Sequence, residues 1–98
     1  MRLTDHEVAA IKAAAREAFG ETAVVRLFGS RLDDSVKGGD IDLHLEVEPE
    51  CSDYRHTGNF RWNLMNRIGE RAVDVVILER GRAPRRIDRV AMAEGVRL

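Results

Sequence analysis

Asp-Ile-Asp-Leu-His-Leu-Glu-Val, residues 40–47, is the stretch of sequence that decides the fold. Its apolar side chains stand at every second position, which is the period of a β-strand that buries one face. Asp40 and Asp42 are two residues apart, so they point to the same face, about 6.5–7 Å apart along the strand. We expect the apolar face to pack on the core and the two carboxylates to converge on one ion.

The residues before this strand predict a second strand that runs into a glycine turn. Residues 23–28 are mostly β-branched or apolar and are too few for a stable helix. Gly29 allows a close approach of the backbone to a ligand, or a positive φ. Ser30 can cap a short helix over residues 31–36, whose first amides would attract phosphate.

A polar loop, residues 33–39, separates the glycine turn from the acidic strand. Its two glycines leave room where the chain reverses near a bound group. Lys37 is either a phosphate ligand or an ordinary solvated lysine. Asp33 and Asp34 suit a turn and a helix start better than a metal site.

A later apolar run, Ala-Val-Asp-Val-Val-Ile-Leu at residues 72–78, predicts another strand with one carboxylate inside it. Burying an unpaired Asp74 in an apolar strand is costly, so we expect it to have a cation or a strong hydrogen-bonding partner. Arg71 is one candidate, and a metal ion shared with Asp40 and Asp42 is the other. Three carboxylates on one face repel one another unless metal ions neutralise them. Their hard oxygen ligands suit Mg²⁺, and a site for two ions is the arrangement that we expect.

The first helix is predicted over residues 4–19. Thr4 followed three residues later by Glu7 is a capping-box pattern, and apolar residues then recur at helical spacing. Gly20 is placed to end this helix.

Two further helices complete the predicted fold. Apolar residues at i, i+4 and i+8 predict a helix over residues 53–67, and Pro84 suits the first position of a short helix over residues 84–94. Tyr54 and Trp62 either pack in the core or border a ligand, and we favour core packing. The fold class is therefore α/β (α+β), a small mixed sheet of three or more strands with helices packed on one face.

Length and composition indicate one soluble domain over residues 1–98. Hydrophobic residues make up 44% and charged residues 34% of the chain, which is ordinary for a globular protein. No apolar run approaches the roughly 20 residues of a membrane helix, and the first residues lack the apolar core of a signal peptide. We therefore expect a cytoplasmic protein with no membrane partner. Cys51 is the single cysteine, so no internal disulfide is expected.

The net charge of −1 conceals an asymmetry between the two halves of the chain. Residues 1–50 contain 6 basic and 11 acidic side chains, and residues 51–98 contain 10 and 6. The ten arginines form either a face for phosphates or an acidic partner, or a scattered, solvated surface, and we favour the second interpretation. We do not expect direct binding of nucleic acid.

The order of these features resembles the minimal nucleotidyltransferase (MNT) family of the DNA polymerase beta-like superfamily, which includes the MntA-type antitoxins. Members are often encoded beside HEPN partners as antitoxin and toxin. The pattern is a strand, Gly-Ser, a loop, Asp-x-Asp, a helix and a third Asp on a later strand. It falls here on Gly29-Ser30, Asp40-Ile41-Asp42 and Asp74 and covers nearly the whole chain.

The resemblance implies a polymerase beta-like nucleotidyltransferase fold and a role for each matched residue. Gly29 and Ser30 would hold the nucleotide triphosphate, with Arg31 as a further phosphate contact. Asp40 and Asp42 would bind both Mg²⁺ ions. Asp74 would bind the catalytic ion and assist the nucleophile.

The sequence thus predicts a magnesium-dependent transferase that moves AMP from ATP to a hydroxyl on a partner protein. The resemblance suggests that this partner is a HEPN-type toxin. The alternative is a non-catalytic, nucleotide-binding antitoxin or subunit that acts by partner binding. Transfer to a small molecule and nucleic-acid polymerisation are disfavoured, because enzymes of those kinds carry additional substrate-binding elements.

Overall fold

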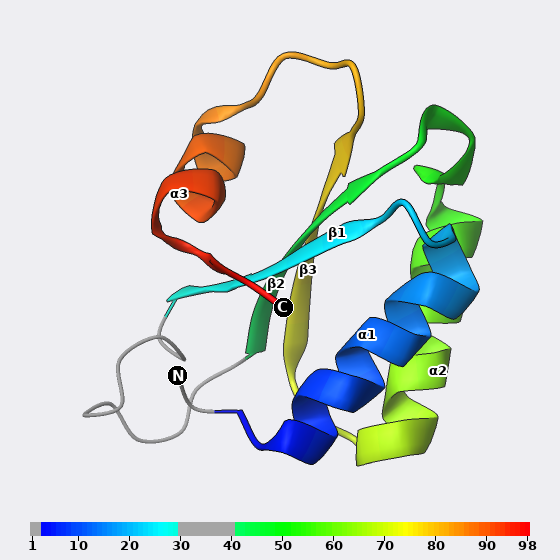
Figure 1. Cartoon of the computed structure of the whole chain (residues 1–98). Coiled ribbons are helices and arrows are strands. Elements are labelled where there is room, and N and C mark those ends of the chain that lie inside the picture. Colours follow the sequence, from blue (N-terminus) through cyan, green and yellow to red (C-terminus); the bar gives the residue numbers. More distant parts are fainter. Residues whose placement is uncertain (1–2, 30–40) are drawn as a thin grey trace.

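The structure, a computed structural model, describes residues 3–29 and 41–98 and contains three helices and one mixed sheet (Figure 1). The elements are α1 (Asp5–Phe19), β1 (Val24–Phe28), β2 (Ile41–Val47), a short 3-10 helix (Pro49–Cys51), α2 (Tyr54–Ile68), β3 (Val73–Glu79), α3 (Arg86–Glu94) and β4 (Val96–Arg97). The helices and strands predicted in this part of the chain are confirmed to within two residues. The helix expected over residues 31–36 lies outside the described residues, and β4 was not predicted. None of the described helices is long and apolar enough to span a membrane.

The four strands lie in the order β3-β2-β1-β4. β1 is antiparallel to both β2 and β4, whereas β2 and β3 are parallel. Parallel neighbours need a long crossover connection, and α2 provides it between β2 and β3. β3 and β4 are therefore the two edges of the sheet.

The core lies between the sheet and the helices α1 and α2. Leu43 and Leu45 of β2 are fully buried there, together with the other apolar residues at alternate positions of this strand. Phe19 of α1 and Phe60 of α2 meet with their ring centroids 5.7 Å apart. The alternation that predicted a half-buried strand therefore corresponds to the packed face of β2.

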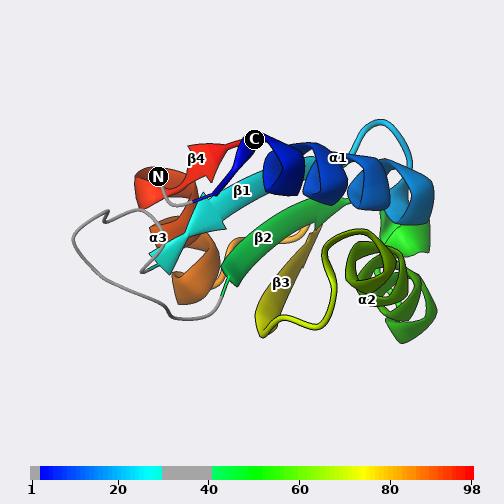
Figure 2. The ribbon, with the colours of Figure 1, turned by 90° about the horizontal axis from the view of Figure 1, so that it is seen from below.

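The third helix lies on the opposite face of the sheet. Figure 2 shows α1 and α2 on one side of the strands and α3 on the other. His44, which points away from Leu43 and Leu45, bonds to Asp88 of α3. The expectation that the helices pack on one face holds for α1 and α2 and is wrong for α3. A polar side chain of β2, which the apolar pattern does not reveal, holds this helix.

Two aromatic residues expected in the core are on the surface. Tyr54 is 96% exposed and Trp62 is 61% exposed. The inner side of α2 is formed by Phe60 and Leu64, and Trp62 stands about 200° around the helix from Phe60. The prediction of core packing was wrong, because an apolar residue outside the i, i+4 stripe of a helix faces solvent.

Candidate functional site

Asp42 and Asp74 lie side by side where β2 and β3 begin. Parallel pairing places Asp42 opposite Asp74, and hydrogen-bonded strands are about 4.8 Å apart. Both side chains project from the face of the sheet opposite the core, because Leu43 of β2 and its partner Val75 point toward α1 and α2. The structure therefore brings two of the three predicted carboxylates together.

Gly29 ends β1 directly against the Asp42 carboxylate. Phe28 pairs with Asp42, and Gly29 has a φ of +79°. A Cβ on Gly29 would overlap the Asp42 carboxylate. Glycine is the residue that tolerates both this backbone conformation and this lack of space. The close approach predicted for Gly29 is thus made to a carboxylate of the candidate site.

Several predicted site residues lie outside the described part of the chain. These are Ser30, Arg31, Lys37 and Asp40. Within residues 3–29 and 41–98, no cluster of three or more His, Cys, Asp or Glu side chains could hold a metal ion. Asp42 and Asp74 form a pair of hard oxygen donors, the ligand type that Mg²⁺ prefers, and Asp40 is the predicted third member.

Asp74 is exposed, which changes the reason for considering it a ligand. We expected Asp74 to be buried and therefore to need a charged or hydrogen-bonding partner. However, β3 is an edge strand, and the Asp74 side chain is exposed to water. Arg71, the alternative partner, pairs instead with Glu7 (Nη1 to Oε2, 2.5 Å). The Asp74 side chain has no hydrogen bond or ion pair with any residue in the described ranges. Its candidacy therefore rests on its register with Asp42.

We expect Gly29→Ala to weaken both folding and the site. The alanine must adopt a positive φ, which costs about 1–3 kcal/mol. Its methyl group must also push the Asp42 carboxylate aside. Gly20→Ala is the matched control, since Gly20 has a φ of +88° but no atom within 4 Å of the place that an alanine methyl group would occupy. Urea unfolding should show a loss of stability in both variants, and a larger loss for Gly29→Ala, because only its methyl group also displaces Asp42. Titration with Mn²⁺ should show at least about tenfold weaker binding only for Gly29→Ala; equal binding by the two would contradict a role for this close approach.

A buried polar network lies further along the same face of the sheet. His44 and Asp88 are both fully buried, and His44 Nε2 is 2.8 Å from Asp88 Oδ1. Arg85 donates to Asp88 Oδ2 from its backbone N–H (2.7 Å) and from Nε (2.9 Å). Arg85 Nη2 also donates to Asp88 Oδ1 (3.1 Å) and to the Ile77 carbonyl (2.7 Å). The network fastens the start of α3 to β2 and β3.

The charge state of this network follows from the partners of Asp88. Burial raises the pKa of Asp88, but hydrogen bonds from the Arg85 side chain and backbone, and from His44, lower it to about 2. An ionised carboxylate only accepts hydrogen bonds, so the Nε2–H of His44 is assigned as the donor. His44 Nδ1 is buried without a hydrogen-bond partner in the described part of the chain.

Sequence reasoning missed this network because its members are far apart in the chain. His44 and Asp88 are separated by 44 residues, and no spacing rule connects them. One local signal was present, since Asp88 stands at the third position of α3 and bonds back to the backbone N–H of Arg85. That signal identifies a helix start, and the partner on β2 appears only in the fold.

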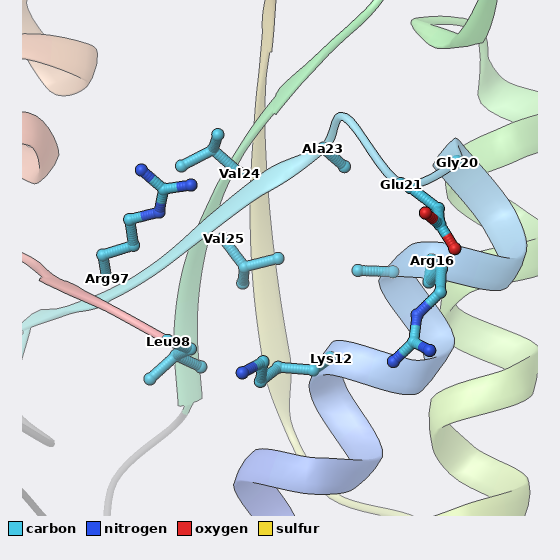
Figure 3. A pocket seen from close by; sticks show the side chains of 10 residues that line it. Lys12, Arg16, Gly20, Glu21, Ala23, Val24, Val25, Arg97 and Leu98 are labelled. Atoms are coloured by element: carbon cyan, nitrogen blue, oxygen red, sulfur yellow. The ribbon is translucent and has the colours of Figure 1, made fainter.

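A hollow of about 390 Å³ lies between α1, β1 and β4, apart from the carboxylate pair (Figure 3). Lys12 and Arg16 line it from α1, and Arg97 lines it from β4. In Figure 3 the Arg97 side chain points away from the other two cations. Its register partner Arg26 lies on the face opposite α1, which agrees with this direction. Because Arg97 points away from Lys12 and Arg16, the three cations do not converge on one point, and we assign no anion site here.

Comparisons with known proteins add no information about the candidate site. No protein-family model matches the chain, and comparisons with curated proteins and with solved structures find no match.

Proposed function

We propose that this chain is a magnesium-dependent nucleotidyltransferase that transfers AMP from ATP to a hydroxyl on a partner protein. The observation that carries the proposal is the parallel register of Asp42 with Asp74, with Gly29 packed against the Asp42 carboxylate. Nucleotidyl transfer needs carboxylates that hold a divalent cation beside a backbone that admits phosphate. This corner of the sheet supplies the carboxylates and a backbone without a side chain.

Each carboxylate has a defined part in the proposed reaction. Asp42 and Asp74, together with Asp40, would hold Mg²⁺, which offsets the negative charge of the phosphates when it is bound. The acceptor oxygen attacks the α-phosphorus, a new O–P bond forms, and the bond to the β-phosphate oxygen breaks to release pyrophosphate. Asp74 is exposed and has no partner among the described residues, so it is available to take the proton of the attacking hydroxyl.

The nucleotide would lie along the turn that follows β1. Gly29 is exposed and lies beside the Asp42 carboxylate. By the resemblance to the MNT family, Ser30 and Arg31 would bind the triphosphate there. The position of the nucleotide at the ends of β1 and β2 would bring its α-phosphate near the carboxylates.

The acceptor that we propose is a side-chain hydroxyl of a HEPN-type toxin, with this chain as its antitoxin in the cytoplasm. Asp74 belongs to the edge strand β3, where a side chain of another protein can reach it. A hydroxyl presented from outside does not require an enclosed pocket for a small acceptor.

Co-expression with the product of the neighbouring gene tests this proposal. We expect the intact mass of that product to rise by one AMP, and label to transfer from ATP labelled at the α-phosphate but not at the γ-phosphate. Chelation of divalent ions with EDTA should stop transfer, and excess Mg²⁺ should restore it, because the carboxylates need the ion to bind the phosphates. Transfer of the γ-label, or transfer that persists in EDTA, would overturn the proposal.

A further inference from the structure

Helix α3 crosses the face of the sheet that carries the candidate site. Its first turn is held over β2, where Asp88 bonds to His44 (2.8 Å). Its end reaches β1, where a Cβ on Gly95 would lie 3.1 Å from the carbonyl oxygen of Leu27. The helix therefore runs across the strands, from β2 toward β4 (Figure 2).

The two flanks of α3 face opposite ends of the strands. Arg85, directly before the helix, donates from Nη2 to the carbonyl of Ile77 in β3 (2.7 Å). Ile77 lies three residues beyond Asp74, which is about 10 Å farther along the strand. The flank of α3 on the side of Arg85 therefore faces away from the carboxylate pair, and the other flank faces toward it.

Two exposed apolar residues stand on the flank toward the carboxylates. Asp88 and Ala91 are buried, so they mark the side of α3 that faces the sheet. Side chains advance by about 100° per residue around a helix, which places Ile87 and Val90 on the side of this buried line away from Arg85. Ile87 is 40% exposed and Val90 is 39% exposed.

This flank lies within contact range of the carboxylate pair. The hydrogen bond to His44 places α3 over the row of the sheet that contains this residue. Asp42 precedes His44 by two residues, which is about 6.5–7 Å along β2. A helix with its side chains has a radius of about 5–6 Å, so the flank reaches the row of Asp42 and Asp74. Ile87 and Val90 therefore form an apolar wall beside the two carboxylates.

We propose that this apolar wall binds the base of the nucleotide whose phosphates the candidate site holds. The inference rests on the proposed function and names the part of the substrate that these residues recognise. In a nucleoside triphosphate only the ribose separates the α-phosphate from the base. When the α-phosphate lies beside Asp42 and Asp74, the base is one sugar away and can pack against Ile87 and Val90.

Reach selects this wall among the exposed apolar residues. In the described part of the chain, the large apolar side chains at the surface are Tyr54, Trp62, Ile87, Val90, Met92 and Val96. Tyr54 and Trp62 belong to α2, on the other face of the sheet. Val96 pairs with the core residue Leu27 and so faces α1, and Met92 is on the far flank of α3. Only Ile87 and Val90 remain beside the carboxylates.

Charge and access select a base as the occupant. A nucleobase is uncharged at neutral pH, so Asp42 and Asp74 do not repel it. The proposed protein acceptor reaches Asp74 from the edge strand β3, whereas α3 runs from β2 toward β4. The acceptor and the base can therefore occupy different sides of the carboxylate pair at the same time.

An aliphatic wall predicts a preference for the size of the base. Apolar contact contributes free energy in proportion to the area that it removes from water. A purine offers more ring area than a pyrimidine, and inorganic tripolyphosphate offers none. We therefore expect ATP to bind more tightly than UTP, and UTP more tightly than tripolyphosphate, in the presence of the same divalent ion.

Calorimetric titration of the chain with ATP and with tripolyphosphate, in Mn²⁺ and without a partner protein, tests the wall. We expect Ile87→Ser and Val90→Ser each to weaken ATP binding about five- to tenfold and to leave tripolyphosphate binding unchanged. Met92→Ser is the matched control, because Met92 is 42% exposed on the other flank of the same helix. It should bind both ligands as the unsubstituted chain does, and circular dichroism should be unchanged in all three variants.

The outcomes separate this inference from the proposed function. If AMP is transferred but both serine variants bind ATP normally, the wall does not hold the base and the transferase proposal stands. The same conclusion follows if ATP binds no more tightly than tripolyphosphate. Serine variants that lose affinity for the partner protein alone would assign the wall to the acceptor and overturn the inference. A chain that binds neither ATP nor tripolyphosphate overturns both proposals.

Discussion

Asp74→Asn is expected to lower the rate of AMP transfer by about 10²–10³-fold without destabilising the fold. The amide keeps the shape of the side chain but loses the negative charge that holds Mg²⁺ and the basicity needed to take the proton of the attacking hydroxyl. Asp74 is exposed and has no partner among the described residues, so its replacement breaks no contact there. The initial rate of transfer from α-labelled ATP measures the first effect, and a urea unfolding curve measures the second.

Glu70→Gln is the matched control for this experiment. Glu70 is also exposed, precedes the same strand, and makes no hydrogen bond or ion pair with the rest of the described chain. It should transfer AMP at the unsubstituted rate, because its carboxylate is not in register with Asp42. Full activity of Asp74→Asn beside an inactive Asp42→Asn would show that the third carboxylate of the site is another residue.

The elements that the sequence predicts well are those whose signal is local. The capping box at the start of α1 forms both of its hydrogen bonds, Glu7 N to Thr4 Oγ1 (3.1 Å) and Thr4 N to Glu7 Oε1 (2.9 Å). Likewise, the alternation of residues 41–47 specifies a strand with one buried face, and Leu43 and Leu45 occupy that face. Such patterns involve residues within one element, so the sequence alone contains the information.

Two of the errors, those on Asp74 and α3, arise where the answer depends on how elements far apart in the chain are arranged. Asp74 was expected to be buried because its neighbours in sequence are apolar, but β3 is at the edge of the sheet and the side chain is exposed. For the same reason the position of α3 was wrong. The polar residue that fastens this helix, His44, finds its partner 44 residues away.

The candidate site is intermediate between these cases. Alternation predicts that the Asp42 side chain projects from the polar face of its strand, and the same rule applies to Asp74 on its own strand. Whether the two become neighbours depends on parallel pairing and on the register between β2 and β3. The contact of Gly29 with Asp42 depends similarly on the antiparallel register that pairs Phe28 with Asp42.

Asp88→Asn is expected to lower the free energy of unfolding by about 2 kcal/mol at pH 7. The carboxylate is fully buried, and its pKa is about 2 in the folded protein compared with an ordinary value of 3.8. An asparagine keeps an acceptor for His44 Nε2–H but removes the negative charge that Arg85 binds. Part of the loss is therefore electrostatic, and that part must vary with pH.

The direction of this variation follows from the lowered pKa. Because the folded state holds the proton more weakly than the unfolded chain, the stabilisation is complete well above pH 3.8 and is lost as the pH falls through 3.8 toward 2. Urea unfolding at pH 7 and near pH 2 should show the stability difference between Asp88→Asn and the unsubstituted protein shrinking to well under about 1 kcal/mol. Glu70→Gln, an exposed carboxylate without these partners, should differ by less than about 0.5 kcal/mol at both pH values. A difference for Asp88→Asn that stays constant with pH would mean that the hydrogen bonds of Asp88, and not its charge, hold α3 to the sheet.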